Sequence, residues 1–258
     1  MMSLSLFSLE NKVALITGGN GGIGHAIALG LCSAGANVAV TGRNSQKNEI
    51  VAEELGDAGA VFSLDVRDEP AVERTIAQVV ERFGRLDILV NNAGNGRGGP
   101  VMEMSGEDWE AVIGTHLTGS FLCAKHAAKM MAAQGTGGKI INIGSMYSVF
   151  GAPNFADYGS AKAGVLGLTR SLAIELAPHN IQVNAILPGW YETEMTQQVY
   201  DSSRGEQIRR KTPAGRWGEG EDIVGTGVFL ASAASDFVTG AAIPVDGGYL
   251  ITERFVHE

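Results

Sequence analysis

The stretch 13-VALITGGNGGIG-24 joins a short apolar run to a glycine-rich segment. The run VALIT predicts a β-strand that is buried on both faces. Glycines at 18, 22 and 24 allow a tight turn, let a pyrophosphate approach the backbone and let the following helix pack closely against the strand. A glycine-rich loop by itself can be an ordinary turn, but its place between a first strand and a first helix favours an anion-binding turn.

Similar apolar runs, rich in Val and Ile, alternate with longer helical patterns along the rest of the chain. This alternation predicts an α/β fold, with a doubly wound parallel sheet of about seven strands and helices on both faces. Ligands in such folds bind beyond the carboxyl ends of the strands. The predicted strands are 13–17, 38–41, 60–66, 86–94, 139–145, 181–189 and 241–246, and the predicted helices are 22–34, 46–55, 70–83, 107–133, 156–177 and 220–233.

Composition narrows the class of protein. The 258 residues, 45% of them hydrophobic, predict a single domain over 1–258 with an N-terminal extension at 1–11. A net charge of −9 argues against nucleic acid or an anionic membrane surface as the main partner. No targeting segment or membrane span is evident, and Cys32 and Cys123 have neither disulfide nor metal-site spacing. We therefore expect a cytoplasmic protein with a small-molecule ligand and no metal.

The stretch 156-ADYGSAKAG-164 places a tyrosine and a lysine among small residues. Tyr158 and Lys162 are four residues apart, so on a helix they share one face, and the lysine can lie beside the phenol. The pair is a candidate proton donor with a neighbouring cation. A lone YxxxK is more often an ordinary surface helix, so the pair needs support from other motifs.

Four further features supply that support. They are TGxxxGIG at 17–24, NNAG at 91–94, Ser145 thirteen residues before Tyr158, and PG at 188–189. With these features and the Tyr–Lys pair, the chain resembles the short-chain dehydrogenase/reductase family from Lys12 to about Leu250. The resemblance implies a Rossmann-type sheet and NAD(H) or NADP(H) as cofactor. It also implies reversible hydride transfer between a carbonyl and a secondary alcohol.

The resemblance assigns roles to the motif residues. Tyr158 would be the general acid in reduction and the base in oxidation. A free tyrosine has a pKa of about 10, so the positive charge of Lys162 and of an oxidised nicotinamide would help to stabilise the phenolate. Lys162 would also hold the nicotinamide ribose, and Ser145 would donate a hydrogen bond to the substrate oxygen.

One position departs from the family pattern. The segment 115-THLTGSF-121 carries His116 where the family has an asparagine that helps to hold a water in a proton relay. A neutral imidazole could hold that water, with a charge that depends on pH, or His116 could be a structural residue.

The end of the second strand, 38-VAVTGRN-44, bears on the choice of cofactor. An acidic residue there selects NAD, whereas this chain has Gly42 and Arg43, which resembles the members that prefer NADP. Gly21 stands where many NADP users carry a basic residue, so NAD remains the alternative. Asn91 could line the cofactor cleft or only brace the sheet. The cofactor residues that the resemblance implies are Gly18, Asn20, Gly22, Ile23, Gly24, Arg43, Asp65, Val66, Asn91, Ala93, Gly94, Tyr158, Lys162, Pro188, Gly189 and Thr193.

Several substrates are compatible with these motifs. The segments 3–18, 134–148 and 213–218 resemble gluconate 5-dehydrogenases and 2-deoxygluconate 3-dehydrogenases, which favours a sugar acid or polyol. A carrier-protein reductase is less favoured, because 130-MMAAQGTGGK-139 offers no basic cluster for an acidic carrier. A carbonyl reductase of broader range also stays open, as does a nucleotide-binding regulator without chemistry.

Positions after the strands nominate the substrate pocket. Arg97 could bind a carboxylate or be a solvated loop residue, and Met146 and Tyr147 could be wall residues only. The polar segment from about 191 to 215 is predicted to be a lid. By resemblance, helices 107–133 and 156–177 would build a homotetramer. The substrate candidates are Asn95, Arg97, Met146, Tyr147, Asn154, Trp190 and Tyr191.

Overall fold

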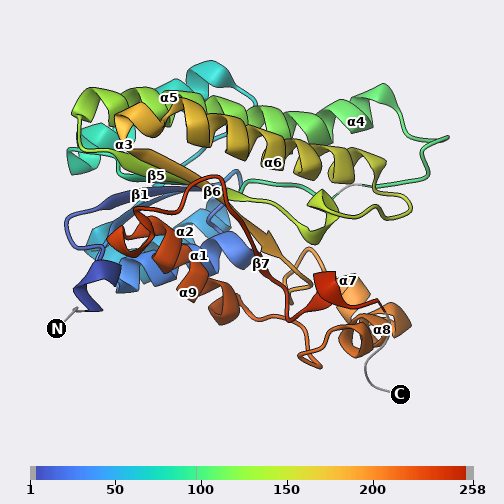
Figure 1. The fold of residues 1–258 in the computed structure, drawn as a ribbon. Helices are drawn as coiled ribbons and strands as arrows, with labels where there is room; N and C mark the ends of the chain where they lie inside the picture. The colour runs from blue at the N-terminus through green and yellow to red at the C-terminus, as the bar shows by residue number, and fades with distance from the viewer. Residues whose placement is uncertain (1–3, 97, 254–258) are drawn as a thin grey trace.

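Seven parallel strands form one sheet in the order β3-β2-β1-β4-β5-β6-β7 in the computed structural model, which describes residues 4–96 and 98–253 (Figure 1). The predicted doubly wound α/β fold is confirmed. The strands are β1 (Val13–Thr17), β2 (Asn37–Thr41), β3 (Gly59–Phe62), β4 (Ile88–Asn91), β5 (Gly138–Ile143), β6 (Ile181–Pro188) and β7 (Ala242–Val245).

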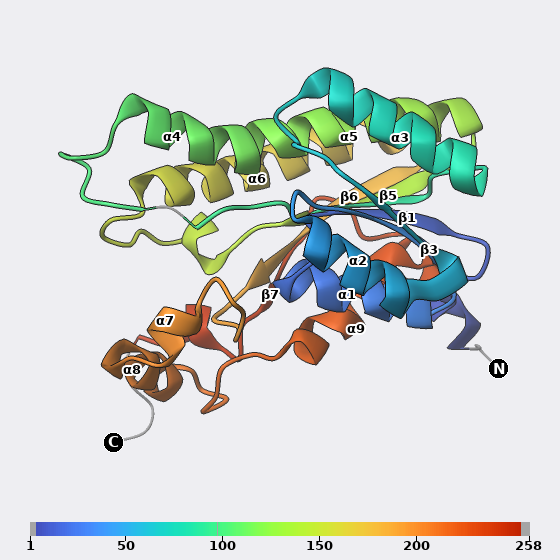
Figure 2. The same cartoon turned by 180° about the vertical axis from the view of Figure 1, so that it is seen from behind.

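Helices cover both faces of the sheet, as Figures 1 and 2 show from opposite sides. One layer contains α3 (Glu69–Phe83), α4 (Gly106–Ile113), α5 (Gly119–Gln134) and α6 (Ala156–Glu175). The other layer contains α1 (Gly22–Ser33), α2 (Ser45–Leu55) and α9 (Gly220–Ala231). Two short helices, α7 (Gln197–Tyr200) and α8 (Ser203–Lys211), lie apart from both layers.

Burial of β1 on both faces explains why its first four residues are all apolar. Ala14 and Ile16 belong to the hydrophobic core under α1 and α9, whereas Val13 and Leu15 belong to the core under α3 and α5. All four side chains are at most 1% exposed. Since burying one large aliphatic side chain contributes about 1.5–3 kcal/mol, a polar residue at either phase of this strand would be strongly destabilising.

The helix N-termini differ in how their free N–H groups are satisfied. Asn44, Asp68 and Ser105 accept a hydrogen bond from the first turn of α2, α3 and α4. Gly21, the N-cap of α1, has no side chain to do so. The first turn of α1 therefore keeps N–H donors available to an anion.

The order in which strands are added to the sheet reverses at β1, since β2 and β3 lie on one side of it and β4 to β7 on the other. Polar contacts fix the loops that follow β1 and β4. Thr17 Oγ1 accepts from the backbone N–H groups of Asn92 (3.0 Å) and Ala93 (3.1 Å), and Asn92 Nδ2 donates to the carbonyl oxygens of Thr17 and Gly18. Gly18 has a φ of 62°, and a β-carbon there would lie 2.9 Å from Ala93 Cα. Only glycine fits where the loops after β1 and β4 approach each other, and ligands bind at this point in such folds.

Four details differ from the sequence expectations. The strand expected at 60–66 ends at Phe62. Leu64 and Asp65, which follow it, line a pocket at the end of the sheet. A π-helical turn, Gly114–Thr118, interrupts the helix expected at 107–133. Helices α7 and α8 fall within the expected lid. The N-terminal extension joins the core, since Leu9 is fully buried and its N–H donates to Ala34 O (2.8 Å).

Candidate active site

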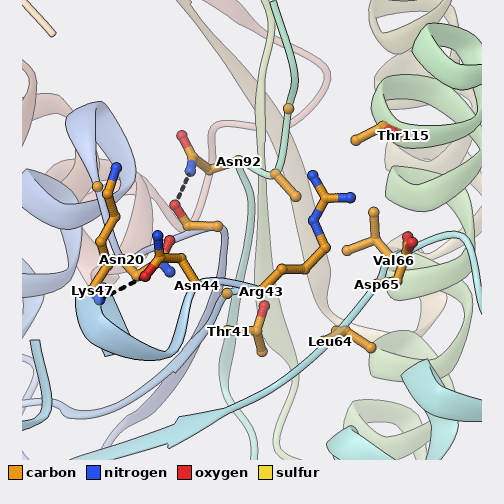
Figure 3. Close-up of a pocket in the computed structure, with 15 residues that line it drawn as sticks. Asn20, Thr41, Arg43, Asn44, Lys47, Leu64, Asp65, Val66, Asn92 and Thr115 are labelled. Carbon is orange, nitrogen blue, oxygen red and sulfur yellow. Dashed lines mark hydrogen bonds between the residues drawn. The ribbon is translucent and has the colours of Figure 1, made fainter. Parts of the chain in front are cut away.

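A pocket opens at the carboxyl ends of β1, β2, β3 and β4, the edge where the sequence places the cofactor; we call it the cofactor pocket (Figure 3). Its walls are backbone and small or polar side chains. Among the predicted cofactor residues, seven line it directly: Gly18, Asn20, Arg43, Asp65, Val66, Ala93 and Gly94.

The position after β2 is shaped by Asn20. A β-carbon on Gly42 would lie 2.0 Å from Asn20 Nδ2, and Asn20 is itself fixed because this Nδ2 donates to Asn48 Oδ1 (2.7 Å). Asn48 Nδ2 in turn donates to Gly42 O (3.1 Å). The space that an acidic side chain at position 42 would need is therefore already filled.

Arg43 brings the positive charge at this end of the pocket. Its side chain extends into the pocket (Figure 3), and within 4–96 and 98–253 no carboxylate forms an ion pair with its guanidinium. Nearby Asp65 is paired with Arg67 (2.6 Å), and this contact, aided by the charge of Arg43, lowers the pKa of Asp65 to about 2. Arg43 therefore remains available to an anionic group of a ligand.

The four predicted catalytic residues come together beside this pocket. Lys162 Nζ lies 5.6 Å from the centre of the Tyr158 ring, and the His116 ring meets Tyr158 edge-on with 5.1 Å between centroids. Ser145 and Tyr158 line the same cavity, and the Ser145 hydroxyl is near enough to favour the Tyr158 phenolate. Helix α6 carries Tyr158 and Lys162, whereas Ser145 follows β5 and His116 lies in the π-helical turn.

Desolvation sets the pKa of both members of the Tyr–Lys pair. Lys162 is 4% exposed, its Nζ donates to Ile143 O (2.6 Å), and burial lowers its pKa to about 7. Desolvation raises the pKa of Tyr158 above its usual value, and the nearby Ser145 hydroxyl opposes this only in part. Further positive charge in the cleft is therefore needed to favour the phenolate.

His116 is neutral in this environment. Burial, together with the charge of Lys162, lowers its pKa to about 3, which favours a neutral imidazole near neutral pH. Its Nε2 lies 3.1 Å from Asn95 N and 2.9 Å from Asn95 O, while Nδ1 is buried with no partner among the described residues. The ring thus holds the loop after β4 and packs against Tyr158.

A second cavity, of about 570 Å³, lies on the other side of Tyr158 and Ser145; we call it the catalytic cavity. Four of the predicted substrate residues line it: Met146, Tyr147, Asn154 and Trp190. The segment 195–204, which includes α7, closes the opposite wall. A carbonyl carbon placed there would lie next to both hydroxyl groups that the chemistry requires.

Other predicted residues lie elsewhere. Asn91 is 4% exposed and its Nδ2 donates to Ser120 O and Asn142 Oδ1, so it braces the sheet and does not line the cofactor pocket. Asn95 Nδ2 donates to Ala111 O and Thr115 Oγ1, away from the catalytic cavity. Tyr191 is buried, and its hydroxyl donates to Val245 O (3.0 Å). Arg97 lies outside the described residues.

The remaining cofactor candidates surround the pocket rather than line it. Gly22 begins α1, and a β-carbon there would lie 3.4 Å from Thr193 Cγ2, so Thr193, in the segment after β6, lies against the glycine-rich turn. Gly24 lies against the Asn92 side chain, and Ile23 packs on the core. Pro188 ends β6, and Gly189 lines the catalytic cavity.

Sequence reasoning missed several lining residues. Asn92, not Asn91, faces the cofactor pocket, and strand alternation across NNAG is the signal that could have separated them. Lys47 and Thr115 also line the cofactor pocket, and Phe155, Met195 and Arg204 line the catalytic cavity. No short motif marks these positions.

A family model described as enoyl-(acyl carrier protein) reductase matches residues 18–250. The chain belongs to the short-chain dehydrogenase/reductase family. A 2-dehydro-3-deoxy-D-gluconate 5-dehydrogenase of Escherichia coli (strain K12) is 44% identical over 96% of this chain and 99% of its own. A gluconate 5-dehydrogenase of Gluconobacter oxydans (strain 621H) is 40% identical over 96% and 98%.

A solved structure of this family agrees with the fold in detail. The gluconate 5-dehydrogenase of Burkholderia cenocepacia J2315, in complex with NADP and tartrate, superposes with a TM-score of 0.92 at 39% identity, covering 96% of this chain and 99% of that one. Membership of the short-chain dehydrogenase/reductase family makes this chain an NAD(P)-dependent oxidoreductase. Three features fit such a dinucleotide: the close approach of Gly18 to Ala93, the N-terminus of α1 without a side-chain cap, and Arg43 without an ion-pair partner among the described residues.

Among residues 4–96 and 98–253, no helix is both long and apolar enough to traverse a membrane. Nor do three His, Cys, Asp or Glu side chains in those ranges gather closely enough to hold a metal ion.

Proposed function

We propose that this protein transfers a hydride between NADP and a secondary alcohol or ketone of a sugar acid. The observation that carries the proposal is the position of the Ser145 and Tyr158 hydroxyls, which line a cavity adjoining the cofactor pocket. Two of the relatives that match nearly the whole chain act, by their names, on gluconate and on a deoxygluconate derivative.

The chain's own residues would manage the proton. In reduction, the Tyr158 hydroxyl donates its proton to the carbonyl oxygen while Ser145 donates a hydrogen bond to the same oxygen. In oxidation, the Tyr158 phenolate takes the proton of the alcohol. Lys162 stabilises that phenolate and holds the ribose, and NADP supplies or accepts the hydride.

The preference for NADP over NAD rests on Arg43 and Gly42. The unpaired guanidinium at the end of β2 suits a 2′-phosphate, because charge-assisted hydrogen bonds to an anion are roughly twice as strong as neutral ones. Asn20 fills the space in which an NAD-selective carboxylate would stand. The related Burkholderia enzyme was solved with NADP.

The alternatives differ in what they require of the catalytic cavity. A hydrophobic ketone would find aromatic walls at Tyr147, Phe155 and Trp190. A sugar acid would need polar groups, which Ser145, Asn154 and Thr196 supply. A 3-oxoacyl-(acyl carrier protein) reductase is also 40% identical, so the 44% identity with the deoxygluconate dehydrogenase is what favours the second substrate class.

The test is the initial rate of NADP(H) absorbance change with D-gluconate, its 5-keto and deoxy derivatives, polyols and aromatic ketones, for wild type and Tyr158→Phe. We expect turnover of a sugar acid and a loss of about 10²–10⁴-fold in kcat/KM for the variant, the contribution of general acid–base catalysis. Cofactor affinity should stay within a few-fold, as measured by calorimetry. Equal rates for variant and wild type would rule out Tyr158 as the acid–base group.

Substitution of Arg43 by Ser tests the cofactor preference. We expect kcat/KM for NADP to fall about 10–100-fold, because one or two charge-assisted hydrogen bonds to the phosphate are lost. The kcat/KM for NAD should change by less than about 3-fold. A parallel fall for both cofactors would show that Arg43 supports the fold and does not select the phosphate.

Assembly and location form a second part of the proposal. We propose a homotetramer in the cytoplasm. Apolar side chains exposed on α5, α6 and the segment before β7, namely Phe121, Ile174 and Phe237, offer surfaces for contact between copies. The segment from about 191 to 215 would act as the lid. Light scattering of the purified protein decides the oligomeric state.

A further inference from the structure

The charge balance of the catalytic cavity differs from that of the whole protein. The chain carries a net charge of −9, yet the described residues that line the cavity include no Asp, Glu, Lys or His. One lining residue among them is charged, and it is Arg204 on α8. A cavity built to accept a neutral ketone or polyol has no need of an unbalanced cation at its mouth.

Aromatic side chains hold Arg204 toward the cavity. Its guanidinium carbon lies 5.7 Å from the centre of the Trp190 ring. The guanidinium also interacts with the Tyr147 hydroxyl, where its positive charge opposes the rise in the pKa of Tyr147 that burial causes. Both aromatic residues line the cavity, so the cation lies along its wall.

The backbone beneath Arg204 is anchored as well. Trp217 is 6% exposed, and its Nε1 donates to the carbonyl oxygen of Gly205 (3.1 Å), the residue that follows Arg204. Trp217 also packs against Trp190 and Tyr200, with ring centroids 5.3 and 5.2 Å apart. The start of α8 is therefore fixed to the same aromatic cluster that forms the cavity wall.

Other arginines of α8 are used differently. Arg209 and Arg210 both pair with Glu206 on the exposed side of the helix. Within the described part of the chain, Arg204 has no carboxylate partner. An arginine without a counter-ion, held against a reaction cavity, is suited to a carboxylate, which its planar fork can bind through two hydrogen bonds.

We propose that Arg204 binds the carboxylate of the substrate and thereby selects sugar acids over neutral polyols and ketones. This inference rests on the proposed function and adds a specificity-determining residue to it. The sequence suggested Arg97 for this role, which lies outside the described residues; Arg204 lines the cavity from α8. Because the binding cation belongs to the lid, the carboxylate also draws the lid onto the substrate.

The decisive pair of substrates is D-gluconate and D-sorbitol, because sorbitol has a hydroxymethyl group in place of the carboxylate. For Arg204→Gln we expect KM for gluconate to rise about 10–100-fold with kcat within about 3-fold, the effect of losing a bidentate ion contact. The kcat/KM for sorbitol should fall by less than about 3-fold, and Arg204→Lys should recover part of the gluconate KM. Arg209→Gln, on the same helix, is the matched control and should leave both substrates unchanged.

Binding of gluconate to the NADP-loaded protein, measured by calorimetry, separates this inference from the proposed function. If wild type binds gluconate but turns over none of the sugar acids tested, the proposed function fails, and weaker binding of gluconate to Arg204→Gln still supports the inference. If gluconate is turned over and Arg204→Gln changes neither KM nor the gluconate-to-sorbitol ratio, the inference fails and the function stands. Equal losses for both substrates, or no gluconate binding by wild type, also overturn the inference.

Discussion

The cofactor pocket and the catalytic cavity lie side by side but are built in different ways. The cofactor pocket takes its walls from the ends of four neighbouring strands, and all of its lining residues lie within the first 115 positions. The catalytic cavity takes its walls from Gly96, Gly98 and Gly99 and from the segments 145–158 and 189–204, which come together only in the folded protein. The first is mainly backbone and small polar groups, whereas the second has aromatic walls and a cation from the lid.

This difference separates what is shared from what is selective. A dinucleotide presents the same phosphates to every enzyme that uses it, so backbone donors on rigid strand ends suffice. A substrate must be distinguished from similar molecules, and loops on that scaffold can vary without disturbing the sheet. Residues that discriminate should therefore lie mostly on the side of the lid, with Arg43 as the exception on the cofactor side.

The largest expected effect on cofactor use comes from Gly42→Asp, which changes the cofactor pocket and not the catalytic cavity. The new side chain would collide with Asn20, break its bond to Asn48 and place a negative charge beside Arg43. We expect kcat/KM for NADP to fall at least about 100-fold, through both strain and charge repulsion. Steady-state rates with NADP and NAD measure this loss.

A companion variant divides strain from charge. Gly42→Asp combined with Asn20→Gly removes the collision, so the thermal midpoint should return toward wild type while the loss for NADP remains. Unchanged NADP kinetics in Gly42→Asp would contradict the role given to the Asn20 side chain. It would also show that this pocket is more adaptable than the catalytic cavity.

His116 lies between the two regions and offers a test through pH. The pKa of His116 is about 3 in the folded protein and about 6.5 in the unfolded chain. Between these two pH values the unfolded chain binds more protons, so the free energy of unfolding rises with pH. The cost at pH 5 relative to pH 8 is about 2 kcal/mol. His116→Asn should remove this difference from the unfolding free energy measured with urea at the two pH values.

The catalytic pH profile is the control for the same variant. Because the imidazole is already neutral above pH 5, kcat/KM of wild type and His116→Asn should follow parallel curves from pH 5 to 9. A limb of the profile that disappears in the variant would mean that His116 titrates during catalysis and is not only a structural contact.

The smallest effect is expected where the two regions touch. Lys47 of the cofactor pocket forms an ion pair with Glu194 of the lid segment, and both side chains are exposed. Exposed pairs contribute about 0–1 kcal/mol, so Glu194→Gln should change KM for NADP less than about 5-fold and fade further at high salt. A larger change in kcat than in KM would show that the ion pair controls lid motion.

Much of the fold could be predicted because local patterns agreed with one another. The apolar strands, the alternating helices and the glycine-rich turn each indicated the same sheet, and Tyr158, Lys162 and Ser145 converge as their motif predicts. The role of Asn91 was harder to predict, since Asn91 ends β4, Asn92 follows it, and the pleat decides which side chain enters the sheet. Tyr191 follows β6 as expected, but its side chain turns into the core.

By itself, the sequence determined the order of strands and helices, the anion-binding turn and the catalytic pair, because each depends on spacing within a few residues. Only the tertiary structure decided which distant side chains share a surface. It buried His116, which lowers the pKa of the imidazole, placed Asn20 in the space beside Gly42, and brought Arg204 of α8 to the wall beside Trp190. Desolvation and contact between segments far apart in the chain depend on packing, which no local spacing encodes.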